Sequence, residues 1–299
     1  MRIAIAGSSG LMGTALAERL VSDGHEVIRL VRRPARSGEE VTWDPAGGVL
    51  AAGALAGVDG VVNLAGAGVG DKRWTPEYKQ VLRSSRLDST AVLVDAMLAL
   101  DAPPSVLVNA SAQGYYGDRG EELLTEDAAP GTGFLTELVL DWEAAARRAD
   151  EASGGAIRVA MIRTGLVMAP RGGAFGRLLP LARLGLGGPL GSGRQWWSWI
   201  TLADQVSAIV HLLTHEVHGP VNLSAPNPAR QKEIVDAIGR ELHRPTVLPA
   251  PAFALRAVLG EFSSEVLGST RMAPHAIQRS GFTFAHPDLA SGVRWVLGR

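Results

Sequence analysis

Gly7-Ser8-Ser9-Gly10-Leu11-Met12-Gly13 is the stretch that decides the fold. It follows the apolar run Arg2–Ala6 and opens a helix-length segment, Leu11–Ser22. Where such a turn binds a dinucleotide, one glycine permits the tight bend, one lets the backbone approach the pyrophosphate, and one lets helix and strand pack closely. The pyrophosphate lies at the helix N-terminus, where free N–H groups and the helix dipole favour negative charge. We therefore expect residues 7–13 to bind a dinucleotide, and a glycine turn that binds nothing is the alternative.

Outward from this turn, the chain alternates between short apolar runs and helix-length segments. The apolar runs are Arg2–Ala6, Glu26–Val31, Gly60–Leu64, Ser105–Ala110 and Ala156–Arg163, and the helical segments are Leu11–Ser22, Arg86–Leu100 and Gly133–Ala152. Near-continuous apolar strands separated by helices are typical of a parallel sheet covered on both faces. We predict an α/β fold, a Rossmann-type doubly wound parallel sheet.

The pattern changes after Arg163. Residues 169–193 are rich in glycine and proline, residues 195–200 hold three tryptophans, and Thr201–Leu213 and Gly219–Leu223 have the patterns of a helix and a strand. We predict a dinucleotide-binding domain over residues 1–168, completed by about 201–223. Residues 169–200 and 224–299 are expected to form a smaller C-terminal lobe that caps the substrate.

Composition narrows the function. The chain of 299 residues has a net charge of −1 and no cysteine, so thiol chemistry and cysteine metal sites are excluded and nucleic acid is not an expected partner. No basic and apolar leader precedes the first strand, and no uncharged apolar run reaches roughly 18 residues, so we expect a cytoplasmic protein without a membrane partner. His211 and His215 lie one helical turn apart without a ligand set beside them, and we predict no metal.

Two arginines follow the second apolar run, where an NAD site usually has an acidic residue for the ribose hydroxyls. This position holds Val31-Arg32-Arg33. No carboxylate is there to repel a 2′-phosphate, and a guanidinium can bind one bidentately. The sequence therefore favours NADP(H) as the cofactor, with a solvated basic turn as the alternative.

Several motifs occur in the order found in one protein family: Gly7–Gly13, Leu30–Arg33, Asn63–Gly66, Ser111–Gly117, Arg163–Gly165, Gly191–Gln195 and Gly219–Leu223. Together they resemble the atypical, extended short-chain dehydrogenase/reductases of the epimerase family, and the segment from about Arg244 resembles the domain of unknown function that ends those proteins. The resemblance covers nearly the whole chain. It implies that Asn63, Leu64, Ala65 and Gly66, together with Arg163, lie at the cofactor, although tight packing alone would also account for the small residues.

The acid/base pair of the larger family is missing. The family uses Tyr-x-x-x-Lys on the helix after the fifth strand, whereas this sequence has Phe134 or Leu135 at the tyrosine position and Leu138 or Val139 at the lysine position. None of these side chains can move a proton. The usual dehydrogenase mechanism is therefore absent in its usual form.

Ser111 and Tyr116 are the predicted catalytic residues. Ser111 matches the family serine that polarises the reacting oxygen, and Tyr116, or in second place Tyr115, is the substitute acid/base; a turn-capping serine and an aromatic packing residue are the alternatives. Tyr115, Arg194 and Trp197 are the predicted substrate-binding residues. Arg194 and Trp197 lie in the stretch Gly191–Trp199, which resembles the region that contacts the nucleotide part of sugar-nucleotide substrates in extended members. A lobe junction with core tryptophans is the other reading of that region.

Two functions follow as hypotheses. The first is an NADP(H)-dependent oxidoreductase or epimerase that acts on a hydroxyl- or carbonyl-bearing small molecule, with a sugar nucleotide as one candidate. The second is a non-catalytic NADP(H)-binding redox sensor or regulatory protein, which the missing Tyr-x-x-x-Lys pair favours. Assembly into a homodimer is left open, and the segment Asp71–Arg86 could either cover the cofactor or form such a contact.

Overall fold

The computed structural model describes all residues from 1 to 299. An eight-stranded sheet in the order β12-β8-β6-β5-β1-β2-β3-β4 forms its centre, and every neighbouring pair is parallel except β3 with β4. The strands are β1 (Arg2–Ala6), β2 (Glu26–Val31), β3 (Glu40–Asp44), β4 (Val49–Leu50), β5 (Gly60–Asn63), β6 (Val106–Ala112), β8 (Arg158–Thr164) and β12 (Gly219–Leu223). The predicted Rossmann-type doubly wound sheet is confirmed.

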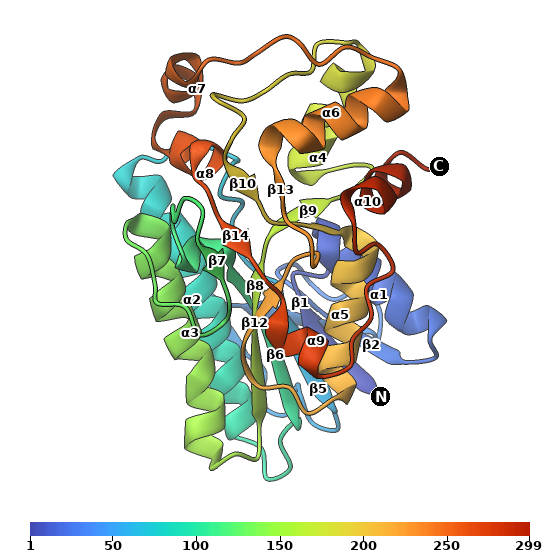
Figure 1. Ribbon diagram of the computed structural model, residues 1–299. Coiled ribbons are helices and arrows are strands. Elements are labelled where there is room, and N and C mark those ends of the chain that lie inside the picture. The colour runs from blue at the N-terminus through green and yellow to red at the C-terminus, as the bar shows by residue number, and fades with distance from the viewer.

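Helices cover both faces of this sheet (Figure 1). Helices α1 (Leu11–Ser22) and α5 (Leu202–Thr214) lie on one face, and α2 (Pro76–Leu98) and α3 (Phe134–Ser153) lie on the other. Alternate residues of β1 supply the two cores, because successive side chains of a strand point to opposite faces: Ile3 and Ile5 enter one core, and Ala4 and Ala6 enter the other.

Helix α2 begins ten residues before the predicted start at Arg86. Thr75 is its N-cap and accepts a hydrogen bond from the Tyr78 backbone N–H, Pro76 occupies the first turn, and Glu77 places an acid near the positive end of the helix dipole. The segment Asp71–Arg86, considered above as a cofactor cover or a dimer contact, is therefore mostly the first turns of a helix. The start signal Thr-Pro-Glu was present in the sequence.

A smaller lobe lies above the carboxyl edge of the sheet (Figure 1). It contains α4 (Gly173–Arg183), α6 (Gln231–Leu242), α7 (Ala252–Leu259), α8 (Ser263–Leu267) and α10 (Leu289–Val296), with the short strands β9 (Leu166–Met168), β10 (Trp196–Trp197), β11 (Trp199–Thr201) and β13 (Ala229–Arg230). The lobe has a hydrophobic core of its own, which includes Phe175, Trp199 and Ile234. None of the helices in the chain is both long enough and apolar enough to cross a membrane.

Part of the segment 224–299 returns to the main domain instead of staying in the lobe. Strand β14 (Arg271–Met272) pairs with β7 (Leu123–Leu124), and α9 (His275–Arg279) places Ile277 in the core beneath the main sheet, where Phe284 also packs. The predicted lobe boundaries therefore do not separate two independent cores. Two 3-10 turns, η1 (Gln113–Tyr115) and η2 (Gly260–Phe262), complete the order of elements.

Candidate functional site

The glycine turn has the geometry that a pyrophosphate site requires. Gly7 has a φ of +78°, and a Cβ there would lie 2.6 Å from the carbonyl carbon of Leu64. A Cβ on Gly13 would lie 2.2 Å from the Gly7 carbonyl oxygen, so α1 packs too closely on the turn for any side chain at this position. No side chain caps α1 at Gly10, so the first-turn N–H groups remain available to an anion.

Asn63 holds the loop that faces this turn. The fully buried Asn63 side chain accepts a hydrogen bond from the Ala65 backbone N–H at 3.2 Å and donates to Asn109 Oδ1 at 2.8 Å and Thr90 Oγ1 at 3.0 Å. These bonds fix the backbone of Leu64 and Ala65 against Gly7. Asn63 thus supports the predicted cofactor loop from within the sheet, since none of its surface reaches solvent.

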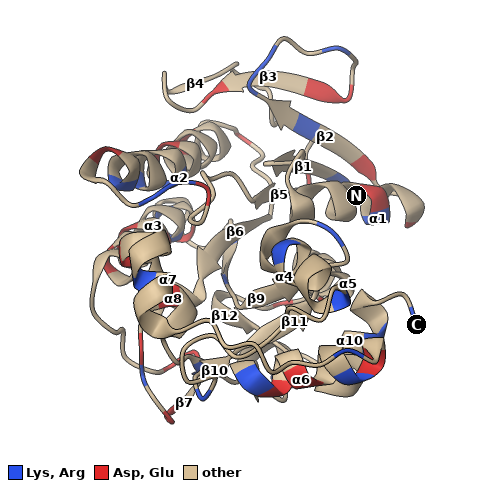
Figure 2. Ribbon diagram, turned by 90° about the horizontal axis from the view of Figure 1, so that it is seen from above, with Lys and Arg blue, Asp and Glu red and all other residues tan.

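The two predicted 2′-phosphate arginines have different environments. Arg33 forms a bidentate ion pair with Glu40, with N···O distances of 2.7 and 2.5 Å, and its hydrogen bonds lower the pKa of the Glu40 carboxyl to about 2. Arg32 is exposed and forms no hydrogen bond or ion pair. Of the two, Arg32 is therefore the one whose guanidinium is free (Figure 2 shows the basic β2–β3 connection).

Ser111 and Arg163 lie in a buried network that spans three strands. Arg163 pairs with Glu143 of α3 through two N···O contacts of 2.8 Å, and each side chain is 2% exposed. Ser111 donates to Glu143 Oε1 at 2.6 Å. Burial opposes the charge of Arg163, but the bonds to Glu143 outweigh it and raise the pKa of the guanidinium. Arg163, predicted at the cofactor, is thus paired with Glu143 inside the sheet edge, and its contact with the cofactor stays a prediction.

Tyr116 belongs to the same network. It is 0% exposed, its hydroxyl lies 2.7 Å from Asn222 Oδ1, and it accepts a hydrogen bond from Arg163 at 3.0 Å. Burial raises the pKa of Tyr116 to about 12 even though Arg163 opposes the shift. This arrangement favours the packing role over the predicted acid/base role, because the hydroxyl has no open side from which a substrate could reach it.

The three predicted substrate residues have different surroundings. The Tyr115 ring packs against the Arg163 guanidinium, whose Cζ lies 3.4 Å from the ring centroid. Arg194 is exposed, with its side chain unpaired, and Trp197 donates from Nε1 to the Val266 carbonyl at 3.3 Å. Trp197 packs on the core of the lobe, which agrees with the lobe-junction reading.

A pocket of about 620 Å³ opens where the family tyrosine would stand. The turn at Gly114 and Gly117 and the start of α3, including Leu135, form one wall, and the C-terminal lobe contributes Glu261, Ser264 and Glu265. Both views show α8 over the same end of α3 (Figures 1 and 2). The pocket thus lies at the carboxyl edge of the sheet, where open α/β folds bind ligands.

Glu265 is the titratable residue of this pocket that sequence reasoning missed. Burial raises the pKa of its carboxyl to about 7, and no hydrogen bond or ion pair holds it. The other charged groups of the pocket are engaged elsewhere: Glu261 pairs with Lys79 at 2.6 Å, Arg119 pairs with Glu122 at 2.7 Å, and Asp118 accepts from the Ser269 N–H at 3.1 Å. Nothing in the local sequence marks Glu265, because its burial arises from the way the lobe packs on α3.

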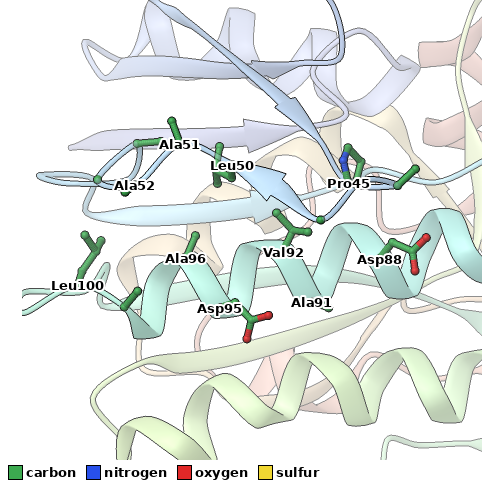
Figure 3. A pocket seen from close by; sticks show the side chains of 15 residues that line it. Pro45, Leu50, Ala51, Ala52, Asp88, Ala91, Val92, Asp95, Ala96 and Leu100 are labelled. Atoms are coloured by element: carbon green, nitrogen blue, oxygen red, sulfur yellow. The ribbon is translucent and has the colours of Figure 1, made fainter.

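A second pocket, of about 580 Å³, lies between α2 and residues 45–54 (Figure 3). Leu50 and Ala51 face Val92 and Ala96 of α2 across it, and Asp88 and Asp95 lie along the same helix. It contains none of the predicted site residues.

Comparison with known protein families divides the chain into two matched regions. The model of the NAD dependent epimerase/dehydratase family matches residues 3–224, and a domain of unknown function, DUF1731, matches residues 250–296. Epimerase family protein Mb2239 of Mycobacterium bovis is 43% identical, with 99% of this chain and 98% of that protein covered. The human epimerase family protein SDR39U1, crystallised with NADPH, is 32% identical with a TM-score of 0.92, and each chain is covered completely.

A nucleoside-diphosphate sugar epimerase from Corynebacterium glutamicum is 34% identical with a TM-score of 0.80, and the match covers all of this chain and 58% of that one. MoeE5 in complex with UDP-glucuronic acid and NAD superposes with a TM-score of 0.75 at 21% identity, a likeness of fold alone.

Proposed function

The chain belongs to the NAD-dependent epimerase/dehydratase family, and from that premise we propose that it is an NADP(H)-dependent oxidoreductase or epimerase. It would transfer hydride reversibly between the nicotinamide and a hydroxyl- or carbonyl-bearing small molecule. A sugar nucleotide is one candidate substrate, in view of the epimerase of Corynebacterium glutamicum.

The observation that carries the cofactor assignment is the free guanidinium of Arg32. Glu40 already pairs with Arg33, so the exposed and unpaired guanidinium of Arg32 is our candidate for the 2′-phosphate, and no carboxylate takes the place of the usual ribose-binding acid. The first-turn N–H groups of α1 suit the pyrophosphate. The NADPH in the human SDR39U1 crystal structure supports the same choice.

When bound, the nicotinamide supplies or accepts the hydride. The protein must then give one proton to the oxygen of the reduced carbonyl, or take one from the alcohol in the reverse direction. Glu265 is our candidate for this proton, because its carboxyl lines the pocket at Gly114 and Leu135 and its pKa of about 7 suits exchange near neutrality. Ser111 and Tyr116 would instead keep the sheet edge rigid through Glu143, Arg163 and Asn222.

Titration with NADPH and NADH, followed by cofactor fluorescence, tests the cofactor assignment. NADPH should bind more tightly than NADH, and Arg32→Ala should weaken NADPH by roughly 10- to 100-fold, the loss of one charge-assisted contact, while leaving NADH nearly unchanged. Arg33→Ala is the matched control and should have the smaller effect on NADPH. Equal affinity for both cofactors in the unaltered protein would contradict the assignment.

A non-catalytic NADP(H)-binding sensor remains the second candidate. The missing Tyr-x-x-x-Lys pair and the complete burial of Tyr116 favour it. A screen of aldehydes, ketones and sugar nucleotides, with NADPH oxidation as the readout, separates the two candidates. Turnover that Glu265→Gln lowers at least tenfold would support the enzyme with Glu265 as its acid. NADPH binding without turnover of any compound would favour the sensor.

A further inference from the structure

Arg86 is a partly buried arginine without a carboxylate partner. It lies on α2, and its side chain makes a single hydrogen bond, from Nη1 to the Leu82 carbonyl of its own helix at 3.0 Å. A guanidinium carries five N–H donors, so most of those of Arg86 are unused. Burial lowers the pKa of Arg86 to about 10, and no ion pair compensates for the lost hydration.

Two other arginines of the chain, in contrast to Arg86, have a carboxylate partner. Arg83, on the same helix, is paired with Asp141 of α3, and the deeply buried Arg163 is paired with Glu143. Removing a charge from water without giving it a partner is unfavourable, which is why charges shielded from solvent are normally paired. The partner of Arg86 is therefore to be sought outside the chain.

The surroundings of Arg86 place it at the cofactor loop. A Cβ on Gly66 would lie 3.3 Å from the Arg86 Cζ, and the adjoining residues Leu64 and Ala65 lie against Gly7 of the glycine turn. The Trp142 ring, whose centroid is 5.1 Å from the Cζ, packs on the guanidinium from α3. A rigid, oriented guanidinium of this kind can bind a carboxylate or a phosphate bidentately.

We propose that Arg86 is the anion-binding subsite for the substrate, and that the substrate carries a carboxylate or phosphate group held beside the Asn63–Gly66 loop. The inference deepens the proposed function and rests on it. The two anionic groups of NADP(H) already have their own sites, since the pyrophosphate goes to the N-terminus of α1 and the 2′-phosphate goes to Arg32. A further cation, on α2 beside Gly66, therefore points to an anion on the reacting molecule.

Arg86→Met tests this subsite, with Arg83→Met on the same helix as the matched control. Each protein is saturated with NADP⁺, and its thermal midpoint is followed while inorganic phosphate or succinate is added, with sodium chloride at equal ionic strength as the reference. Phosphate, succinate or both should raise the midpoint of the unaltered protein and of Arg83→Met above the chloride reference. Arg86→Met should lose that rise, and its NADPH affinity should stay within about threefold of the original, less than one charge-assisted contact.

The other outcomes are equally decisive. A loss of NADPH affinity above about tenfold, the size of one charge-assisted contact, would assign Arg86 to the cofactor and overturn the substrate subsite. If Arg86→Met is less stable than the original protein without ligand, or does not fold, the role of Arg86 is to stabilise the fold, and the substrate subsite is refuted. An unaltered protein that binds NADPH but gains nothing from phosphate or succinate would refute the subsite and leave the cofactor assignment intact.

Discussion

At the scale of single residues, an unpaired carboxyl in the pocket gives the molecule a measurable pH dependence. The folded protein raises the pKa of Glu265 from 4.5 to about 7, so folding favours its protonated form. The stability from this group is complete below pH 4.5 and is lost as the pH rises to about 7. At pH 8 the free energy of unfolding of Glu265→Gln, measured with urea, should therefore exceed that of the original protein by about 1–3 kcal/mol. Near pH 4.5 the two proteins should be equally stable. Equal stability of the two proteins at pH 8 would show that the carboxyl is not buried.

Tyr116→Phe addresses a second residue, for which the sequence and the structure suggest different roles. Removing the hydroxyl leaves Asn222 and Arg163 each without one hydrogen-bond partner in a buried site, so stability should fall by about 1–3 kcal/mol. NADPH binding should not change, and neither should the rate with any carbonyl found in the screen, because the hydroxyl is fully buried. Urea unfolding and initial rates measure the two effects. A rate that falls a hundredfold without loss of stability would restore Tyr116 as the acid/base.

At the scale of elements, the turn between β1 and α1 contains one glycine needed for packing, Gly13, and one expected to matter for ligand binding alone, Gly10. Gly13→Ala would place a Cβ 2.2 Å from the Gly7 carbonyl oxygen, and we expect it to destabilise the fold by at least ~2 kcal/mol and to abolish NADPH binding. Gly10→Ala would place its Cβ 3.4 Å from the same oxygen, where it fits. It should fold normally and still bind NADPH more weakly, because the methyl group keeps the pyrophosphate from the turn. If both variants bind NADPH like the original, the turn is structural only.

The same unit explains why some of the fold was predictable from sequence. Arg2–Ala6, Leu11–Ser22 and Glu26–Val31 were predicted with the bounds that the structure has, because the glycine turn fixes where strand and helix meet. Strand β3 was missed, because only one of its residues is buried and only Val41 and Trp43 are apolar. Glu265 and Arg86 were missed for another reason: each owes its properties to burial between distant segments, which leaves no mark in the local sequence.

At the scale of the whole molecule, the C-terminal segment joins the lobe and the sheet domain into one folding unit. Ile277 and Phe284 are buried in the core under the main sheet, although the chain reaches them only after building most of the lobe. Ile277→Ala should therefore destabilise the sheet domain together with the lobe, by about 2–4 kcal/mol, with a single unfolding transition. Far-UV circular dichroism reports both parts, and tryptophan fluorescence weights the lobe, which holds Trp196, Trp197 and Trp199; the two curves should coincide. Two separated transitions, with Ile277→Ala moving only one of them, would instead show that the lobe opens independently of the sheet, and a pocket formed between α3 and α8 could then admit substrate by lobe movement.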